Sequence, residues 1–509
     1  MENKAQPIAK MATLVTAVII VSRLLGFARE TLIANIFGVG LMTDIYIIAT
    51  RIVVTAGLVV SVYMAKTFVP SYIHYREMHG DKKALHIANN ALGVALIINT
   101  CLMLILMFMS PLILATMGLD EQHADLARVP VMIMLFKLPL LTFVEFFTAY
   151  LTARKSFVGA NFIGIPLSIV FMAVCFIIGA QGGATGLSIA SVASIMAQLI
   201  VIFIWVSRTE YQFNFSAHFN LPEMRRDMQI FAPALLSSVL LNINVWVDTT
   251  IAVRLGEGSV TAIGFADRLL GLMGGLVIVP LSGMAYSYMS GYAAKNAINK
   301  MLQILWQSSR VMLFLILPMV AISIIFSAEI VEIVFQRGRF TPEAGDLTSL
   351  AFMWYLPALP SFAIHTLVIR FYYGIHDTKT PLYCGIVAVS VGVLLSLGLS
   401  GYMGVGGLGL ASSISTGLST ILLLILLRRK IGSLGFRKTA VDFIKMGFCI
   451  IPCLLTAFAI QHLLSDAHVI LRFAGGAVAG GIAYLLMAAL LREMVMVDAI
   501  RVTRGYLRI

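Results

Sequence analysis

The stretch "MATLVTAVIIVSRLLGFARETLIANIFG", residues 11–38, is a long apolar run that contains three charged side chains. Its first eleven residues are uncharged. The charged residues are Arg23, Arg29 and Glu30, and the run continues for eight residues after Glu30. An apolar helix of about 20 residues crosses a hydrocarbon core of about 30 Å. We therefore predict that this stretch is the first membrane span, uncleaved because Arg23 follows the apolar run where a signal peptide has a small-residue cleavage site.

The composition of the whole chain resembles that of this stretch. Of 509 residues, 60% are hydrophobic and 12% are charged, and the mean hydropathy is +0.95. Soluble domains carry about twice this share of charged residues. We predict an all-α polytopic membrane protein with 14 transmembrane helices, centred near residues 22, 57, 97, 139, 170, 195, 240, 273, 316, 359, 391, 418, 452 and 481.

The net charge of +12 comes from basic residues in the predicted connections. Examples are "REMHGDKK" (76–83), "MRRD" (224–227) and "RRKIGSLGFRK" (428–438). Lys and Arg are enriched in cytoplasmic loops, so we expect these connections and both termini, including the C-terminal tail, in the cytoplasm. This explanation makes a nucleic-acid partner unnecessary.

Two echoes within the chain predict an internal duplication. "ETLIANIFG" (30–38) resembles "DTTIAVRLG" (248–256) at an offset of 218, and "GGATGLSIAS" (182–191) resembles "VGGLGLASSIS" (405–415) at an offset of 223. We predict an N-terminal six-helix lobe (1–208) and a C-terminal six-helix lobe (209–430), related by a pseudo-two-fold axis along the membrane normal. Transporters commonly bind substrate between such halves.

Residues 431–509 lie outside the repeat and are predicted to form helices 13 and 14. Gly476 and Gly480 form a small-xxx-small pattern in helix 14. Such a pattern favours close helix contact. A groove for a long lipid tail is the functional alternative.

Charged residues within the predicted spans are costly, at roughly 2.5–3.5 kcal/mol each near the bilayer centre. One explanation is a set of buried ion pairs that join helices. Cations outnumber acids, however, and an anionic substrate would supply the missing partner, since Arg binds phosphate with its bidentate fork. The charges are Arg23, Arg29, Glu30, Asp44, Arg51, Lys66, Lys137, Glu145, Asp248, Asp267, Arg268, Arg310 and Arg370.

The chain has no G-x-x-x-x-G-K-[ST] motif, which argues against ATP as the energy source. A coupling monovalent cation or the membrane potential is then the expected driving force. Asp248, with Asn244 one turn earlier, is a candidate cation site, and a helix-packing hydrogen bond explains this pair equally well. We expect no enzymatic activity, no cofactor and no metal centre.

Six motifs together resemble the MurJ (MviN) family, the lipid II flippases of bacterial cell-wall synthesis. They are "SRLLGFARE" (22–30), "TD" (43–44), "APALLSSVLLNINVWVDT" (232–249), "ADRL" (266–269), "FQRGRFTPEA" (335–344) and "HDTKTP" (376–381). The resemblance implies an inner-membrane protein that moves undecaprenyl-diphosphate-linked peptidoglycan precursor to the outer leaflet by alternating access. Membrane lipids and the cell-wall synthesis machinery are the further expected partners.

The resemblance also implies roles for individual residues. Arg23, Arg29 and Arg268 are expected to contact the diphosphate or sugar in a central cavity. Arg51 is a further candidate contact, although it lies in a stretch that departs from the family pattern. Asp44 is expected to gate this cavity or balance its charge. From the residues alone, Glu30 and Asp267, which accompany the arginines, are candidates for the same role.

The second helix departs from the family pattern. It reads "TRIVVTAGLVV" (50–60) where the family usually has "PNLLRR". A flippase for another polyprenyl-diphosphate-linked oligosaccharide is therefore the alternative function. A drug exporter fits less well because organic cations favour an acidic cavity. A membrane glycosyltransferase fits less well because the chain has no D-x-D motif.

Overall fold

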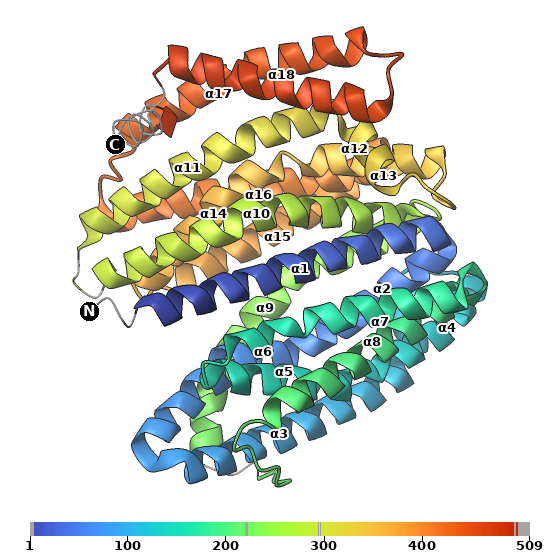
Figure 1. Ribbon diagram of the computed structural model, residues 1–509, viewed down its shortest axis with the longest axis vertical. Helices are drawn as coiled ribbons and strands as arrows, with labels where there is room; N and C mark the ends of the chain where they lie inside the picture. Colours follow the sequence, from blue (N-terminus) through green and yellow to red (C-terminus); the bar gives the residue numbers. More distant parts are fainter. Residues whose placement is uncertain (1–4, 219–221, 294, 296, 493–494, 497–509) are drawn as a thin grey trace. The chain divides into compact units, whose positions relative to one another are not determined.

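The computed structural model of the chain describes residues 5–218, 222–293, 295, 297–492 and 495–496, and every element there is a helix (Figure 1). Residues 497–509, most of the predicted cytoplasmic tail, lie outside the described residues, as do residues 1–4. The chain divides into two compact units. The first comprises Met1–Thr261 with Arg337–Phe340, and the second comprises Ala262–Gln336 with Thr341–Ile509.

The first unit contains the helices that carry most of the predicted site. In chain order they are α1 (Ala5–Phe37), α2 (Leu41–Tyr63), the π-helix η2 (Met64–Phe68), α3 (Val69–Thr116), α4 (Glu121–Leu135), α5 (Lys137–Ala153), α6 (Phe157–Phe162), α7 (Gly164–Ile178), the 3₁₀ turn η3 (Ala180–Gly182), α8 (Gly183–Val206) and α9 (Pro222–Arg254).

The second unit begins within α10 (Ser259–Ala293). Its remaining helices are α11 (Ile298–Ile325), α12 (Ser327–Phe335), α13 (Pro342–Tyr355), α14 (Ala358–Gly374), α15 (Lys379–Met403), α16 (Val405–Ile431), α17 (Phe436–Leu463) and α18 (Val469–Leu490). Figure 1 shows α17 and α18 as an adjacent pair.

The all-helical, polytopic character predicted from the sequence is confirmed. Ten described helical segments are long and apolar enough to cross a membrane, or eleven if α13 and α14, which bend by 43°, form one span. The segment Leu41–Thr116 counts once, although Gly80 breaks it with a φ of 82°. All fourteen predicted centres lie in helices, but the count of fourteen stays a prediction.

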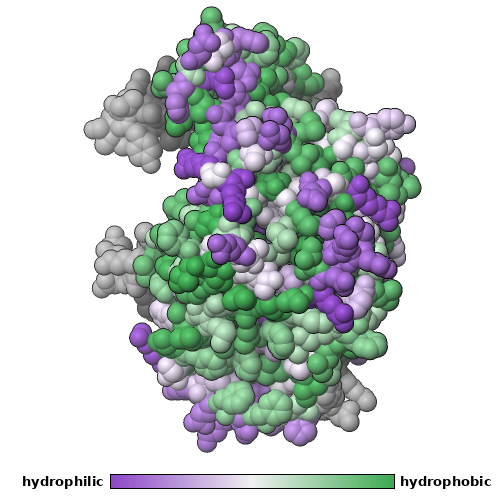
Figure 2. All heavy atoms as spheres, turned by 90° about the vertical axis from the view of Figure 1, so that its right-hand side faces the viewer, coloured by the Kyte–Doolittle hydropathy of each residue, from purple (hydrophilic) through white to green (hydrophobic). Residues whose placement is uncertain are grey.

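Many large side chains on the surface are apolar, as expected for a protein that contacts lipid tails. Phe108 is 89% exposed and Tyr402 is 92% exposed. Figure 2 shows hydrophobic residues over wide parts of one face, with polar residues gathered in separate patches.

The same turn geometry occurs in both halves of the sequence. In residues 150–156 and again in 371–377, three backbone hydrogen bonds close the end of a helix with the same spacing. Lys155 and His376 each adopt the left-handed conformation in these turns, with φ of 63° and 59°. This places the local offset at 221, between the values of 218 and 223 given by the two sequence echoes. The recurrence accords with a duplication, while the lobe boundaries at 208 and 430 stay a prediction.

The turn between α14 and α15 contains the motif "HDTKTP" and is fixed by Asp377. Burial disfavours the ionised carboxylate, but hydrogen bonds from Lys430 and Thr380 outweigh this cost and lower the pKa of Asp377 to about 2. The carboxylate lies 2.7 Å from Lys430 Nζ and 2.6 Å from Thr380 Oγ1. The start of α15 is thereby tied to the end of α16.

Close packing and two ion pairs attach the α17–α18 pair to the rest of the second unit. A Cβ atom on Gly476 would overlap the ring of Phe326, so α18 approaches this ring closely. Arg310 on α11 pairs with Asp442 on α17 at 3.0 Å, and Arg472 on α18 pairs with Glu329 on α12 at 3.3 Å. The glycine pattern therefore serves close packing, one of its two predicted uses.

Candidate functional site

The side chain of Arg29, on α1, contacts two neighbours, and these contacts leave most of its N–H donors unused. Its Nη2 donates to Glu30 Oε1 at 2.8 Å, and its Cζ lies 5.4 Å from the centre of the Phe171 ring. Among the described residues, Glu30 is its only hydrogen-bond partner. A guanidinium has five N–H donors. Because Arg29 and Glu30 are adjacent in α1, their ion pair cannot by itself join two helices.

Asp44 caps the start of α10. Its Oδ2 accepts from Gly258 N at 2.7 Å, and its Oδ1 accepts from Thr261 N at 2.7 Å and from the Thr261 hydroxyl. Asp44 is 6% exposed, so these bonds satisfy a buried carboxylate. A negative side chain at a helix N-terminus is stabilising because it meets unpaired N–H groups. The cap joins the start of α2 to the start of α10.

A loop distant in sequence packs against the end of α1. Arg339 N donates to Asn35 O at 2.9 Å. Gly38 and Gly338 have φ of 71° and 62°, and a Cβ atom on Gly38 would overlap Arg339 O while one on Gly338 would overlap Asn35. We call the α1–α2 turn, the α9–α10 turn and residues 337–340 the turn cluster. Each glycine in this contact is required both by its backbone conformation and by lack of space.

Arg51 and the predicted cation pair lie where α2 meets α9. Arg51 Nη1 donates to Val245 O at 3.2 Å and to the Thr249 hydroxyl. Asp248 is 5% exposed. Asn244 has a buried Oδ1 without a hydrogen-bond partner in the described part of the chain. An amide oxygen of this kind can accept a hydrogen bond or ligate a hard cation.

The remaining predicted residues are accessible. Arg23 is exposed on α1, and Asp267 and Arg268 are exposed on α10 in the second unit. The structure thus groups Arg29 with Glu30 and Arg51 with Thr249, while Asp44 contacts Gly258 and Thr261. The cavity predicted to unite these residues with Arg268 stays a prediction.

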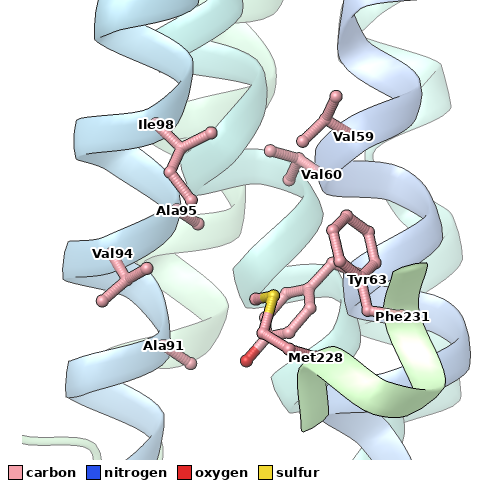
Figure 3. Close-up of a pocket in the computed structure, with 9 residues that line it drawn as sticks. All are labelled: Val59, Val60, Tyr63, Ala91, Val94, Ala95, Ile98, Met228 and Phe231. Carbon is pink, nitrogen blue, oxygen red and sulfur yellow. The ribbon is translucent and has the colours of Figure 1, made fainter. Parts of the chain in front are cut away.

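A pocket in the first unit is apolar and does not contain the predicted arginines. It is lined by residues of α2, α3 and α9 (Figure 3): Val59, Val60, Tyr63, Ala91, Val94, Ala95, Ile98, Met228 and Phe231. At its edge, the Tyr63 hydroxyl lies 3.5 Å from Asp227 Oδ2, and Ser71 Oγ donates to Asp227 Oδ1 at 2.6 Å. Such a lining suits apolar groups rather than a diphosphate.

Sequence reasoning noted Lys137 as an intramembrane charge but left it out of the site. Lys137 Nζ donates to Ser191 Oγ at 2.8 Å, and Arg29 is close enough to Lys137 to repel it. The signal for this residue was its position at the centre of a predicted span. Nothing in the sequence marked Ser191 or the nearby Tyr46 as part of a site, because isolated hydroxyl groups are common in membrane helices.

No group of three or more His, Cys, Asp or Glu side chains within the described ranges is placed to hold a metal ion. The five cysteines are free thiols, and four of them are buried.

The sequence is similar to a known protein family over most of its length. The family model for "Lipid II flippase MurJ" matches residues 33–477. A relative from Rhizobium meliloti, described as a probable lipid II flippase MurJ, is 25% identical over 413 residues, which cover 79% of this chain and 77% of the relative. A relative from Vibrio cholerae with the same description is 24% identical over 428 residues, which cover 81% of this chain and 82% of the relative.

Two solved structures share the fold. A lipid II flippase MurJ in an inward closed conformation matches with a TM-score of 0.79 and 19% identity, covering 95% of this chain and all of the other. An inward-facing multidrug resistance transporter of the MATE family matches with a TM-score of 0.69 and 16% identity, covering 83% of this chain and 99% of the other.

Proposed function

The chain belongs to the lipid II flippase MurJ family, and from this premise we propose how its own residues carry out transport. It is a lipid II flippase of the bacterial inner membrane, a transporter rather than an enzyme. Its substrate is a polyprenyl-linked lipid, and the comparisons do not favour a different saccharide carrier.

The proposed layout has fourteen spans with both termini in the cytoplasm. It assigns residues 1–208 and 209–430 to two six-helix lobes and residues 431–509 to helices 13 and 14. The basic connections support this orientation. The repeated turns at 150–156 and 371–377 support the duplication. In this layout the turn cluster lies on the outer side of the membrane.

The substrate site is proposed to centre on Arg29, and one observation carries this assignment. Within the described part of the chain, Arg29 uses a single N–H donor, toward its own neighbour in α1, which leaves four donors available. A diphosphate oxygen can accept from these donors in bidentate fashion. Arg23, Arg51 and Arg268 are proposed as further contacts, with Glu30 and Asp267 limiting the positive charge while the site is empty.

The turn cluster is proposed to be the outer gate, closed in this structure. Its described contacts are the Asp44 cap, the backbone hydrogen bond from Arg339 to Asn35 and close glycine packing, so opening breaks few bonds. Release of lipid II to the outer leaflet would require these contacts to separate. The coupling step is proposed to use a monovalent cation at Asp248 and Asn244 or the membrane potential.

The test of the substrate site compares Arg29→Ala with Arg29→Lys in bacteria depleted of their own lipid II flippase. The parent should restore lipid II exposure on the outer leaflet, and Arg29→Ala should lower transport by roughly tenfold or more, as expected for a lost charge-assisted hydrogen bond. Arg29→Lys keeps the charge without the fork and should be intermediate.

The control is the membrane level of each variant. Full activity of Arg29→Ala at normal levels would exclude Arg29 from the site. Loss of the protein itself would indicate a structural role instead. Failure of a well-expressed parent would turn attention to the alternative polyprenyl-linked oligosaccharide.

A further inference from the structure

Lys137 lies at the middle of a membrane-spanning segment. The helices α4 and α5 form one apolar span, Glu121–Ala153, interrupted by a break at Phe136. Lys137 is the first residue of α5, sixteen residues from either end of this span. A charge at that depth is costly, and residues of this kind in membrane helices commonly mark substrate or ion pathways.

The ammonium group of Lys137 has a neutral partner rather than an acid. Its Nζ donates to Ser191 Oγ on α8, and Ser191 is 4% exposed. Within the described ranges no carboxylate lies within 4.0 Å of this Nζ. A buried cation is normally compensated by a paired anion. Among the residues that the structure describes, the partner of Lys137 is a hydroxyl.

The surroundings of Lys137 are shared with Arg29. Tyr46 lies near Ser191, and it interacts electrostatically with Arg29 and Glu30. The Tyr46 ring lies 6.3 Å from the ring of Phe171, on which Arg29 stacks. Arg29 and Lys137 repel each other. Two cations, one from α1 and one from α5, therefore lie near each other, and the acid beside Arg29, Glu30, is already bonded to it.

We propose that Lys137 is a further substrate-binding residue, which together with Arg29 binds the diphosphate of the lipid. The proposal rests on the proposed function, since it extends the Arg29 site. The diphosphate brings the negative charge that Lys137 lacks and a second anion for Arg29, which already pairs with Glu30. Its oxygens can accept from the N–H donors of both side chains. Ser191 positions the ammonium while the site is empty.

Two consequences separate this role from a structural one. An uncompensated buried charge destabilises the empty protein, so Lys137→Met should leave its melting temperature unchanged or raised. The same variant should weaken binding of undecaprenyl diphosphate by roughly ten- to hundredfold, as for the loss of one hydrogen bond to a charged group. A lysine needed for packing would give the opposite stability result.

The experiment measures binding of undecaprenyl diphosphate, and separately of inorganic diphosphate, to the purified full-length chain in detergent. The variants are Lys137→Met, Lys137→Arg, Ser191→Ala and the control Lys66→Met, which removes an exposed lysine of the same unit. We expect lipid binding to fall in Lys137→Met, to be largely kept in Lys137→Arg and to be unchanged in Lys66→Met.

Three results would overturn the proposal. They are parent-like lipid binding by Lys137→Met, a lowered melting temperature of its empty form, and a loss confined to inorganic diphosphate, which would assign the site to a free anion. A failure of the proposed function looks different, because the parent chain itself would then neither bind the lipid nor transport it.

Discussion

At the scale of single residues, the partner of each intramembrane charge decides its role. The sequence places Asp44 and Arg51 on one face of a helix, seven residues apart. In the structure Asp44 bonds to Gly258 and Thr261, whereas Arg51 bonds to Val245 and Thr249. Spacing along one helix predicts a shared face, but the partners come from α9, α10 and the turn between them, 194–217 residues away. Helix periodicity contains no information on these contacts.

The cap formed by Asp44 predicts a graded series of variants. Asp44→Ala removes every acceptor and should lower the stability of the closed turn cluster by about 1 kcal/mol, within the usual range for a lost cap. Asp44→Asn keeps one acceptor oxygen and should fall between this variant and the parent. Thermal unfolding of the purified chain measures the order, with the exposed Asp125→Ala as control. Equal melting temperatures for all three Asp44 forms would contradict the capping role.

At the scale of elements, close packing at Gly476 attaches α18 to the second unit. Gly476→Ala places a methyl group against the Phe326 ring and should lower the melting temperature, with a cost of about 1–3 kcal/mol for overpacking. Gly481→Ala on the same helix is the matched control, because a Cβ atom there meets nothing within 4 Å. Similar unfolding curves for the two variants would show that α18 does not depend on this contact.

The elements themselves were largely predictable from sequence, and the register of the repeat was less so. Apolar runs identify spans because lipid requires internally bonded helices, so every predicted centre lies in a helix. The two sequence echoes gave offsets of 218 and 223, whereas Tyr150 O occupies the position of Phe371 O in the recurring turn, at an offset of 221. Apolar side chains replace one another easily along a membrane helix, so matching residues align the two copies of the repeat poorly. The hydrogen-bonded turn aligns them by backbone position.

At the scale of the whole molecule, α1 connects the proposed substrate site to the proposed outer gate. Arg29 lies in this helix, and Asn35 near its end contacts Arg339. A stiff helix transmits a displacement at one end to the side chains along it. The sequence predicted the arginines because charge in an apolar run is conspicuous. It could not predict the contact with residues 337–340, which depends on backbone atoms and two glycines.

This gate contact yields a prediction that also tests the orientation of the chain. Gly338→Ala introduces a Cβ atom against Asn35 at a left-handed position and should detach residues 337–340 from α1. Ser259→Cys, at a position 3% exposed beside the Asp44 cap, provides a reporter thiol. A membrane-impermeant maleimide is applied to the outside of spheroplasts. Adding Gly338→Ala to the reporter should increase labelling of the reporter thiol several-fold. Gly80→Ala, also at a positive φ but with open space around its Cβ atom, controls for backbone strain alone. Labelling seen only in inside-out vesicles would reverse the proposed orientation, and labelling unchanged by Gly338→Ala would remove residues 337–340 from the gate.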